Sequence, residues 1–212
     1  MDLVFNSSDD KLDVSPLVII VQGSPRGDGN CAALAVEAFN ACQTADFETI
    51  IVSSADLMAS AQWCNGCLNC VATGLCIHED DVATFIDMLD EASGLLWITP
   101  IYFSTVPACL KSLIDRMQIF WARREREEVL AFEVRRPAAA VIVGSGADPF
   151  GVEAAVLPLK SASNIAEFTL SDPTVLLGLD ENDAILQAES ADKRAAARTA
   201  IEVFIDRVLA WQ

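Results

Sequence analysis

Five short runs of mostly apolar residues divide the chain, and each has the length of a β-strand that is buried on both faces. They lie at Leu17–Val21, Thr49–Val52, Gly94–Ile98, Ala138–Val143 and Thr174–Leu177. Much of the sequence between them shows the apolar spacing of helices. Strands that alternate with helices predict an α/β fold, in which a doubly wound, five-stranded parallel sheet carries helices on both faces.

The segments between the strands differ in how clearly they predict helices. Four of them show an apolar stripe at three- and four-residue spacing: Ala35, Ala38, Phe39 and Cys42; Val82, Phe85, Ile86 and Leu89; Leu110, Leu113, Ile114 and Met117; and Ala197, Ala200, Ile201, Phe204, Ile205 and Val208. Asp80-Asp81 can cap and charge the start of the second of these helices. Residues 53–62 are expected to form a connecting loop. Pro158 predicts a short or kinked helix around residues 152–161.

The composition indicates one folded domain. Apolar residues make up 52% of the 212 residues, which argues against disorder and allows a sizeable core. Residues 1–15 are polar and acidic, so we expect an N-terminal arm ahead of a domain at residues 16–212. No apolar run reaches membrane-spanning length, and a net charge of −17 would repel nucleic acid. Seven cysteines without the basic start of a signal peptide indicate the reducing cytoplasm.

Four of the seven cysteines follow a compact C-x2-C-x2-C-x5-C pattern: Cys64, Cys67, Cys70 and Cys76. Thiolates are soft ligands, and this spacing lets one short loop wrap a [4Fe-4S] cluster. Zinc more often takes two C-x2-C pairs with a long insert between them. Gly66 and Gly74 can adopt the positive φ that a tight wrap needs. We therefore interpret the inserted loop at residues 63–78 first as a cluster site, with zinc and four unliganded thiols as the alternatives.

The residues that follow the first strand form a loop suited to an anion. Gly23–Asn30 is rich in glycine and small polar residues and leads into a helix, whose first N–H groups and dipole favour a phosphate. Ser24 and Asn30 add donors, and Arg26 adds charge. The pattern is neither G-x-x-x-x-G-K-[ST] nor G-x-G-x-x-G. An ordinary turn with a helix cap is the alternative.

Two further loops follow the third and fourth strands. Pro100–Ser104 contains Tyr102 and Phe103, whose rings suit a flat ring system, although packing in the core is the alternative. Gly144-Ser145-Gly146 follows the fourth strand. Ligands of such sheets bind beyond the carboxyl ends of the strands. We expect these loops to meet there, with the cysteine loop emerging at the same edge.

Together these motifs resemble the flavodoxin-like NADPH-dependent FMN reductase superfamily. Gly23-Ser24-Pro25-Arg26…Gly29-Asn30 resembles its phosphate loop. Thr99-Pro100-Ile101-Tyr102-Phe103-Ser104, followed by Leu110-Lys111…Ile114-Asp115-Arg116, resembles its T-P-x-Y-x-x-x…L-K-x-x-x-D-R stretch. The cysteine loop that ends in Asp80-Asp81 is similar to that of the iron-sulfur flavoprotein branch. The resemblance covers roughly residues 17–146, and three motifs in order are more specific than any one of them.

The resemblance implies a flavodoxin-like sheet of order 2-1-3-4-5, bound FMN, a nearby [4Fe-4S] cluster, and a homodimer or homotetramer. It also implies electron transfer from a ferredoxin-type donor or NAD(P)H to acceptors such as oxygen, peroxide or quinones. The cofactor-binding residues that it implies are Ser24, Arg26, Gly29, Asn30, Cys31, Pro100, Ile101, Tyr102, Phe103, Ser104, Gly144 and Ser145. The family usually has Ser or Thr where this chain has Cys31, so this residue contributes either a weak donor or only its N–H.

The other cysteines and the single histidine receive structural interpretations. Cys42 falls on the apolar stripe of its helix, and Cys109 begins a helix, so both are expected to be structural. We assign His78 to the surface or to the surroundings of the cluster rather than to its ligands, because four thiolates already complete a site.

Charged residues and tryptophans near the motifs are assigned to ion pairs and contacts. Lys111, Asp115 and Arg116 share a helix, where an i, i+4 ion pair is the expected role. The mixed-charge stretch at residues 123–128 is expected to be a solvated segment or a subunit contact. Trp63 would either shield a cluster or contact another subunit.

These observations predict an FMN-dependent oxidoreductase in which a [4Fe-4S] cluster and FMN exchange electrons. The flavin carries the chemistry, so no side chain is needed as a general acid or base. One alternative is an NAD(P)H-dependent FMN or quinone reductase without a cluster. The others are a non-enzymatic electron carrier and a zinc-stapled binding domain with an incidental anion loop.

Overall fold

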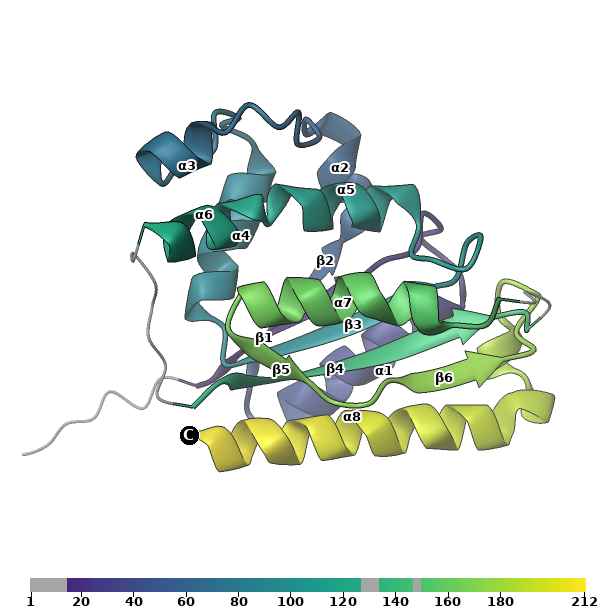
Figure 1. Cartoon of the computed structure of the whole chain (residues 1–212). Coiled ribbons are helices and arrows are strands. Elements are labelled where there is room, and N and C mark those ends of the chain that lie inside the picture. Colours follow the sequence, from purple (N-terminus) through teal and green to yellow (C-terminus); the bar gives the residue numbers. More distant parts are fainter. Residues whose placement is uncertain (1–14, 127–133, 147–149) are drawn as a thin grey trace, which may run out of the picture.

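The computed structural model describes residues 15–126, 134–146 and 150–212 (Figure 1). Within them the chain forms one parallel sheet of order β2-β1-β3-β4-β5, with β6 also paired to β4. The strands are β1 (Leu17–Gln22), β2 (Glu48–Ser53), β3 (Gly94–Pro100), β4 (Arg136–Gly144), β5 (Phe168–Leu170) and β6 (Thr174–Leu177). This order confirms the predicted flavodoxin-like sheet. The arm predicted at residues 1–15 lies outside the described residues except for Ser15.

Helices cover both faces of the sheet (Figure 1). One face packs against α1 (Asn30–Thr44) and α8 (Ala191–Trp211), which follows the short η1 (Ala184–Leu186) and η2 (Ala188–Ser190). The other face packs against α4 (Asp81–Glu91), α5 (Ala108–Arg116), α6 (Gln118–Glu125) and α7 (Glu153–Ile165). The chain between β2 and α4, which contains the four clustered cysteines, forms α2 (Ser54–Ser60) and α3 (Asn69–Thr73). In the ranges described, no helix combines the length and the apolar character needed to cross a bilayer.

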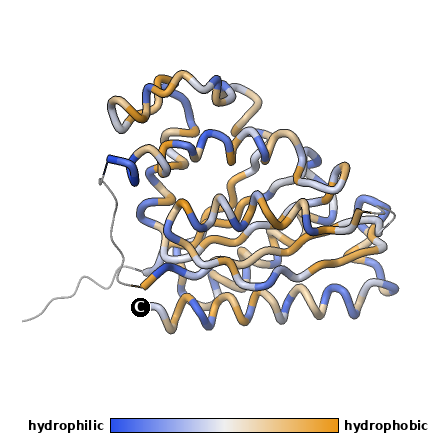
Figure 2. The backbone as a smooth tube through the Cα atoms, viewed as in Figure 1, coloured by the Kyte–Doolittle hydropathy of each residue, from blue (hydrophilic) through white to orange (hydrophobic). Residues whose placement is uncertain are grey.

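Successive residues of the central strands point into two separate hydrophobic cores. In β1, Ile19 and Val21 pack on the side of α4 to α7, whereas Val18 and Ile20 pack on the side of α1 and α8. Figure 2 shows hydrophobic residues running through the central strands. The apolar runs in the sequence are continuous because these strands are buried on both faces.

The expectation of a plain loop at residues 53–62 was wrong, because Ser54–Ser60 forms α2. Ser53 caps this helix: its Oγ accepts a hydrogen bond from Asp56 N at 3.2 Å. The helix has seven residues, which is too short for an apolar stripe to stand out. A cap and local polar residues were the signals available in the sequence.

The fifth position of the sheet is divided between two strands. The predicted strand at Thr174–Leu177 is present as β6, and β5 at Phe168–Leu170 precedes it. Both pair with β4, β5 near its start and β6 near its end. Pro173 lies between them, and because proline has no N–H it cannot continue the ladder.

Pro158 predicted a helix that is either short or kinked, and α7 is not short, since it has 13 residues and continues past the proline to Ile165. A proline inside a helix leaves the carbonyl four residues earlier without its donor, here that of Ala154. Thr105 Oγ1 lies 3.3 Å from the Ala154 oxygen and donates to it. This bond satisfies the carbonyl and ties the loop after β3 to α7.

Candidate functional site

The loops that follow β1, β3 and β4 meet at one edge of the sheet. Gly23 N donates to Ile98 O at 2.8 Å, and Ile101 N donates to Val143 O at 2.9 Å. A Cβ on Gly23 would lie 2.6 Å from Leu110 and 2.7 Å from Thr99, so only glycine fits between β3 and α5 here. The sequence motifs are thus adjacent in space, as the fold class predicted.

The phosphate-loop candidate leads directly into α1. Gly29 is the N-cap residue of α1, and no side chain caps this helix. The N–H groups of the first turn are therefore available to a ligand. Ser24 is buried, and its Oγ accepts a hydrogen bond from Arg26 N at 3.1 Å, which leaves its O–H free to donate elsewhere. Arg26 Nη1 donates to Asn182 Oδ1 at 2.7 Å.

Asn30 connects the phosphate loop to the segment that follows β6. Its Nδ2 donates to Glu181 O at 2.7 Å, and its Oδ1 accepts from Ile185 N at 2.9 Å. Its side chain is buried and committed to these partners. Asn30 thus holds the loop against residues 179–185, a neighbour that no pattern in the sequence indicated.

Cys31 lies in the first turn of α1, with its thiol in the hydrophobic core. Burial raises the pKa of this thiol to about 12, and the nearby charge of Arg26 offsets only part of that rise. The side chain stays neutral and packs against apolar neighbours. The backbone N–H is what Cys31 can offer to an anion.

The aromatic loop after β3 is a tight turn. Tyr102 N donates to Thr105 O at 2.8 Å, and Thr105 N donates to Tyr102 O at 3.1 Å. The two residues between them, Phe103 and Ser104, have φ of 49° and 63°. Left-handed backbone at non-glycine residues is strained and tends to occur at functional sites. The turn leaves Phe103 99% exposed, so this ring is not in the core.

The loop after β4 lies against both neighbours of that strand. A Cβ on Gly144 would lie 3.2 Å from Ile101 and 3.3 Å from Leu177. Ser145 O accepts a hydrogen bond from Gly178 N at 3.1 Å. Gly144 and Ser145 therefore lie next to the loop that begins at Pro100, while residues 147–149 are outside the described part of the chain.

The four clustered cysteines line one pocket, together with His78 and Arg116. Gly66 and Gly74 have φ of 71° and 78°, which confirms the positive φ expected of them. No three Cys, His, Asp or Glu side chains among the described residues are grouped closely enough to hold a single metal ion. The structure therefore gathers the four thiols around a shared space without converging them on one point.

The cysteine loop follows α2 and runs over α5 and α6, on the side away from the sheet (Figure 1). Side chains inside the loop fix its second half. Asn69 Nδ2 donates to Leu75 O at 2.9 Å, and Thr73 Oγ1 accepts from Leu75 N at 3.1 Å. Arg126 at the end of α6 donates to Ala72 O at 2.8 Å, which attaches α3 to α6.

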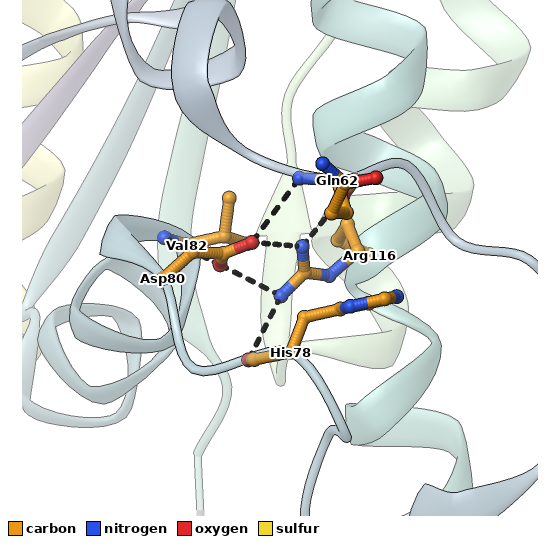
Figure 3. Close-up of polar contacts among 5 residues, drawn as sticks. All are labelled: Gln62, His78, Asp80, Val82 and Arg116. Carbon is orange, nitrogen blue, oxygen red and sulfur yellow. Dashed lines mark hydrogen bonds and ion pairs between the residues drawn. The ribbon is translucent and has the colours of Figure 1, made fainter.

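Arg116 closes the loop from α5 (Figure 3). Its guanidinium makes a two-pronged ion pair with Asp80 and donates to Gln62 O at 2.6 Å, so it joins both ends of the cysteine loop. Asp80 also caps α4, as predicted, by accepting from Val82 N at 3.2 Å. Burial alone would lower the pKa of Arg116, but the bonds and charges of Asp80 and the neighbouring Cys76 raise it.

Arg116 is the residue whose role the sequence analysis missed. We expected an ion pair at i, i+4 on its helix, and Lys111 and Asp115 do form one at 2.6 Å. Arg116 instead pairs with Asp80, which is 36 positions away. The available signal was its place in the L-K-x-x-x-D-R stretch, combined with the acidic pair that ends the cysteine loop.

The remaining cysteines and Trp63 are also placed. Cys42 is fully buried in the core, as expected. Cys109 lies between the ends of β1 and β2, where its thiol accepts from Ser54 Oγ at 3.5 Å and donates to Gly23 O at 3.8 Å. Trp63 is 70% exposed, so within this chain it does not shield the pocket.

Comparison with known proteins agrees with this architecture. The family model described as NADPH-dependent FMN reductase matches residues 16–178. An iron-sulfur flavoprotein of Methanocaldococcus jannaschii is 40% identical over 99 residues, 47% of this chain and 50% of that protein. One of Archaeoglobus fulgidus is 30% identical over 99 residues, 46% of this chain and 43% of that protein. The matched part thus spans about half the length of these relatives.

Solved structures share the fold over nearly the whole chain. The apo form of an NADH:FMN oxidoreductase has a TM-score of 0.59 at 17% identity, covering 90% of this chain and 89% of that one. A flavoenzyme NAD(P)H:acceptor oxidoreductase from Paracoccus denitrificans has a TM-score of 0.56 at 20% identity, covering 93% and 98%. At these identities the likeness establishes the fold alone.

Proposed function

This chain belongs to the NADPH-dependent FMN reductase family, and from that membership we propose a flavin-dependent oxidoreductase that holds FMN and a [4Fe-4S] cluster. FMN would bind where β1, β3 and β4 end, and the cluster would bind in the cysteine loop. The observation that carries the cluster is that Cys64, Cys67, Cys70 and Cys76 line one pocket.

The residues at the end of β1 fit the phosphate of FMN. The start of α1 has no capping side chain, so its N–H groups and dipole are available to an anion. Ser24 would add an O–H donor and Arg26 a positive charge, while Cys31 would contribute its N–H. The loop Pro100–Ser104, with Gly144 and Ser145, would line the ribityl chain and the ring.

The cysteine loop fits an iron-sulfur cluster in the chemistry of its donors. Thiolates are the ligands that such clusters take, and each of four cysteines binds a different iron of a [4Fe-4S] cluster. The ligands then surround the cluster rather than a single ion, which suits four thiols around one pocket. The relatives named iron-sulfur flavoproteins support the same cofactor here.

In this proposal the side chains bind and orient, and the cofactors carry the electrons. When bound, FMN would supply two-electron and one-electron redox chemistry, and the cluster would supply one-electron chemistry. The strained turn at Phe103-Ser104 would support the ring, and Arg116 would keep the cysteine loop closed. A ferredoxin-type protein is the alternative donor.

We also propose a homodimer or homotetramer in the cytoplasm. The cysteine loop exposes four apolar side chains: Trp63 at 70%, Leu68 at 61%, Leu75 at 64% and Ile77 at 56%. A second copy over this surface would remove it from water and keep oxygen from the cluster. Exposed patches of this kind commonly mark contacts between proteins.

The test is to purify the protein without oxygen and measure iron, sulfide, zinc and flavin. The expected result is about four irons and four sulfides per chain, with FMN as the flavin. Flavin without iron would favour the reductase without a cluster, and zinc would favour the zinc-stapled domain. Turnover with NADPH, NADH or a reduced ferredoxin then separates an enzyme from an electron carrier.

A further inference from the structure

The guanidinium of Arg116 has one N–H group left over. Nη1 donates to Gln62 O at 2.6 Å and Asp80 Oδ2 at 2.8 Å. Nη2 donates to Asp80 Oδ1 at 2.9 Å and His78 O at 3.5 Å. Nε is buried and has no hydrogen-bond partner in the described structure. Because the five donors of a guanidinium form a rigid fork, these four bonds fix the direction of the fifth.

This leftover donor belongs to the pocket of the four cysteines. The Arg116 side chain is 2% exposed and lines that pocket, with Cys76 beside its guanidinium. His78 lines the same pocket and also has a buried nitrogen, Nε2, without a partner among the described residues. Its side chain extends away from Asp80 (Figure 3). Buried N–H groups are nearly always hydrogen-bonded, so the unpaired Nε–H of Arg116 at this pocket indicates a ligand that accepts a hydrogen bond.

Arg116 also provides the charge of the pocket. Among the described residues that line it, Arg116 is the only one with a permanent positive charge. The chain as a whole carries a net charge of −17. The ion pair with Asp80 offsets part of this charge, but a cation that is fixed here and shielded from water still acts more strongly on a neighbouring group than an exposed one does.

We propose that Arg116 is a positioning residue for the cluster, an inference that rests on the proposed function. Its Nε–H donates to a sulfur atom at the Cys76 corner of the site. One-electron reduction by an external reductant adds one negative charge to the cluster. A fixed cation and an N–H···S hydrogen bond stabilise that reduced form more than the oxidised form. Arg116 therefore raises the reduction potential of the cluster.

The test is a redox titration, followed by EPR, of anaerobically purified wild-type protein and three variants. Arg116→Gln removes the charge and is expected to make reduction at least tenfold less favourable, a shift of about 59 mV to more negative potential for one electron. Arg116→Lys keeps the charge without the fixed fork and should restore part of the shift. Lys111→Gln removes a positive charge from the exposed side of the same helix and should leave the potential unchanged.

Each outcome bears on the inference. If Arg116→Gln binds iron and its cluster has the same reduction potential as that of the wild type, the inference is wrong. The inference is also wrong if Arg116→Gln and Lys111→Gln shift the reduction potential equally. If Arg116→Gln loses its iron, Arg116→Lys provides the test. An Arg116→Lys variant that keeps its iron and has a reduction potential below that of the wild type supports the inference. An Arg116→Lys variant whose cluster has the wild-type reduction potential contradicts the inference, and so does loss of iron from this variant as well. Wild-type protein without iron would refute the proposed function itself, which is a distinct result.

Discussion

Arg116 and Asp80 are joined by two parallel contacts, Nη1 to Oδ2 at 2.8 Å and Nη2 to Oδ1 at 2.9 Å. The pair links the end of α5 to the residue that closes the cysteine loop and caps α4. The other end of α5 follows the strained turn that begins at Tyr102. One helix thus connects the candidate flavin loop to the candidate cluster loop, which gives the two sites a common support.

The first prediction concerns the stability that this pair contributes. Asp80→Ala leaves the buried Arg116 without its counter-charge and α4 without its cap. Breaking a buried pair in this way costs about 3–5 kcal/mol in the free energy of unfolding, which urea denaturation would measure. Asp81→Ala, which changes an exposed carboxylate in the first turn of the same helix, should cost about 1 kcal/mol or less. Equal losses in the two variants would contradict the prediction.

The second prediction is a dependence of that contribution on pH. Burial would raise the pKa of Asp80, but hydrogen bonds from Arg116, Gln62 and Val82 and the charge of Arg116 together lower it. A carboxyl with a lowered pKa in the folded state stabilises the fold fully above its unfolded pKa of about 3.9. That stabilisation is lost as the pH falls through the folded pKa.

Chemical denaturation at a series of pH values measures this effect. The stability of wild-type protein relative to Asp80→Asn should be constant at neutral pH and shrink in acid below about pH 4. The contributions of the other carboxyl groups to the pH dependence cancel in this difference, because these groups titrate in both proteins. A difference between the two proteins that stays the same from neutral to strongly acidic pH would refute the role assigned to Asp80.

The strands and the helices with stripes were predictable because burial alone determines their pattern. The run at Leu17–Val21 is apolar throughout since both sides of β1 are covered. The split of the last strand depends on Pro173, and the length of α7 depends on Thr105 reaching Ala154. Such pairings join distant positions, and no local period records them.

The loops that form the candidate site could be predicted from the sequence, but the partners of individual side chains could be predicted less well. The four cysteines were found from spacing, because a short loop brings them together whatever the rest of the fold does. Arg116 was not, since the partner of its guanidinium is set by how α5 packs against the loop. Asn30 was predicted to bind a cofactor and remains a candidate, although its side chain is engaged by Glu181 and Ile185.

The third prediction separates two residues of the phosphate loop. Ser24→Ala removes a donor to the phosphate and should weaken FMN binding by about 1.5–3 kcal/mol, the value of a hydrogen bond to a charged group. Asn30→Ala leaves Ile185 N unpaired and should also lower the free energy of unfolding by about 1–3 kcal/mol. Titration of apoprotein with FMN and urea denaturation measure the two effects.

Thr44→Ala is the matched control, because it removes an exposed side-chain hydrogen bond at the far end of α1. It should leave FMN affinity unchanged. Wild-type affinity in a Ser24→Ala, Asn30→Ala double variant would exclude this loop as the phosphate site.

The fourth prediction concerns self-association through the cysteine loop. Ile77→Asp puts a charge into the exposed apolar surface of the loop and should shift the protein toward monomer, since an interface that buries this residue would have to desolvate the charge. Sedimentation velocity at micromolar concentration measures the change. Val36→Asp, on α1 at the other face of the sheet and 54% exposed, should leave association unaffected. Wild-type protein that sediments as a monomer with both cofactors bound would refute the oligomer.

The last prediction assigns the seven cysteines. Alanine variants of the four loop cysteines should lose iron and keep FMN, because a cluster that lacks one ligand is incomplete and the phosphate loop is a separate piece of chain. Variants of the other three should keep both. Burial raises the pKa of Cys31 to about 12 and that of Cys42 to about 11, and both thiols lie in the hydrophobic core beside α1, outside the pocket of the cysteine loop.

Cys109 makes the sharpest control in this set. Its thiol is only partly buried, but it lies between Ser54 and Gly23 rather than at the pocket of the cysteine loop. Cys109→Ala should therefore retain iron, although a thiol near the phosphate loop is removed. Iron, sulfide and flavin are measured on protein purified without oxygen. Two results would contradict this assignment: iron that survives in all four loop variants, or iron that is lost from Cys109→Ala alone. Either result would place the metal outside the cysteine loop and refute a cluster in that loop.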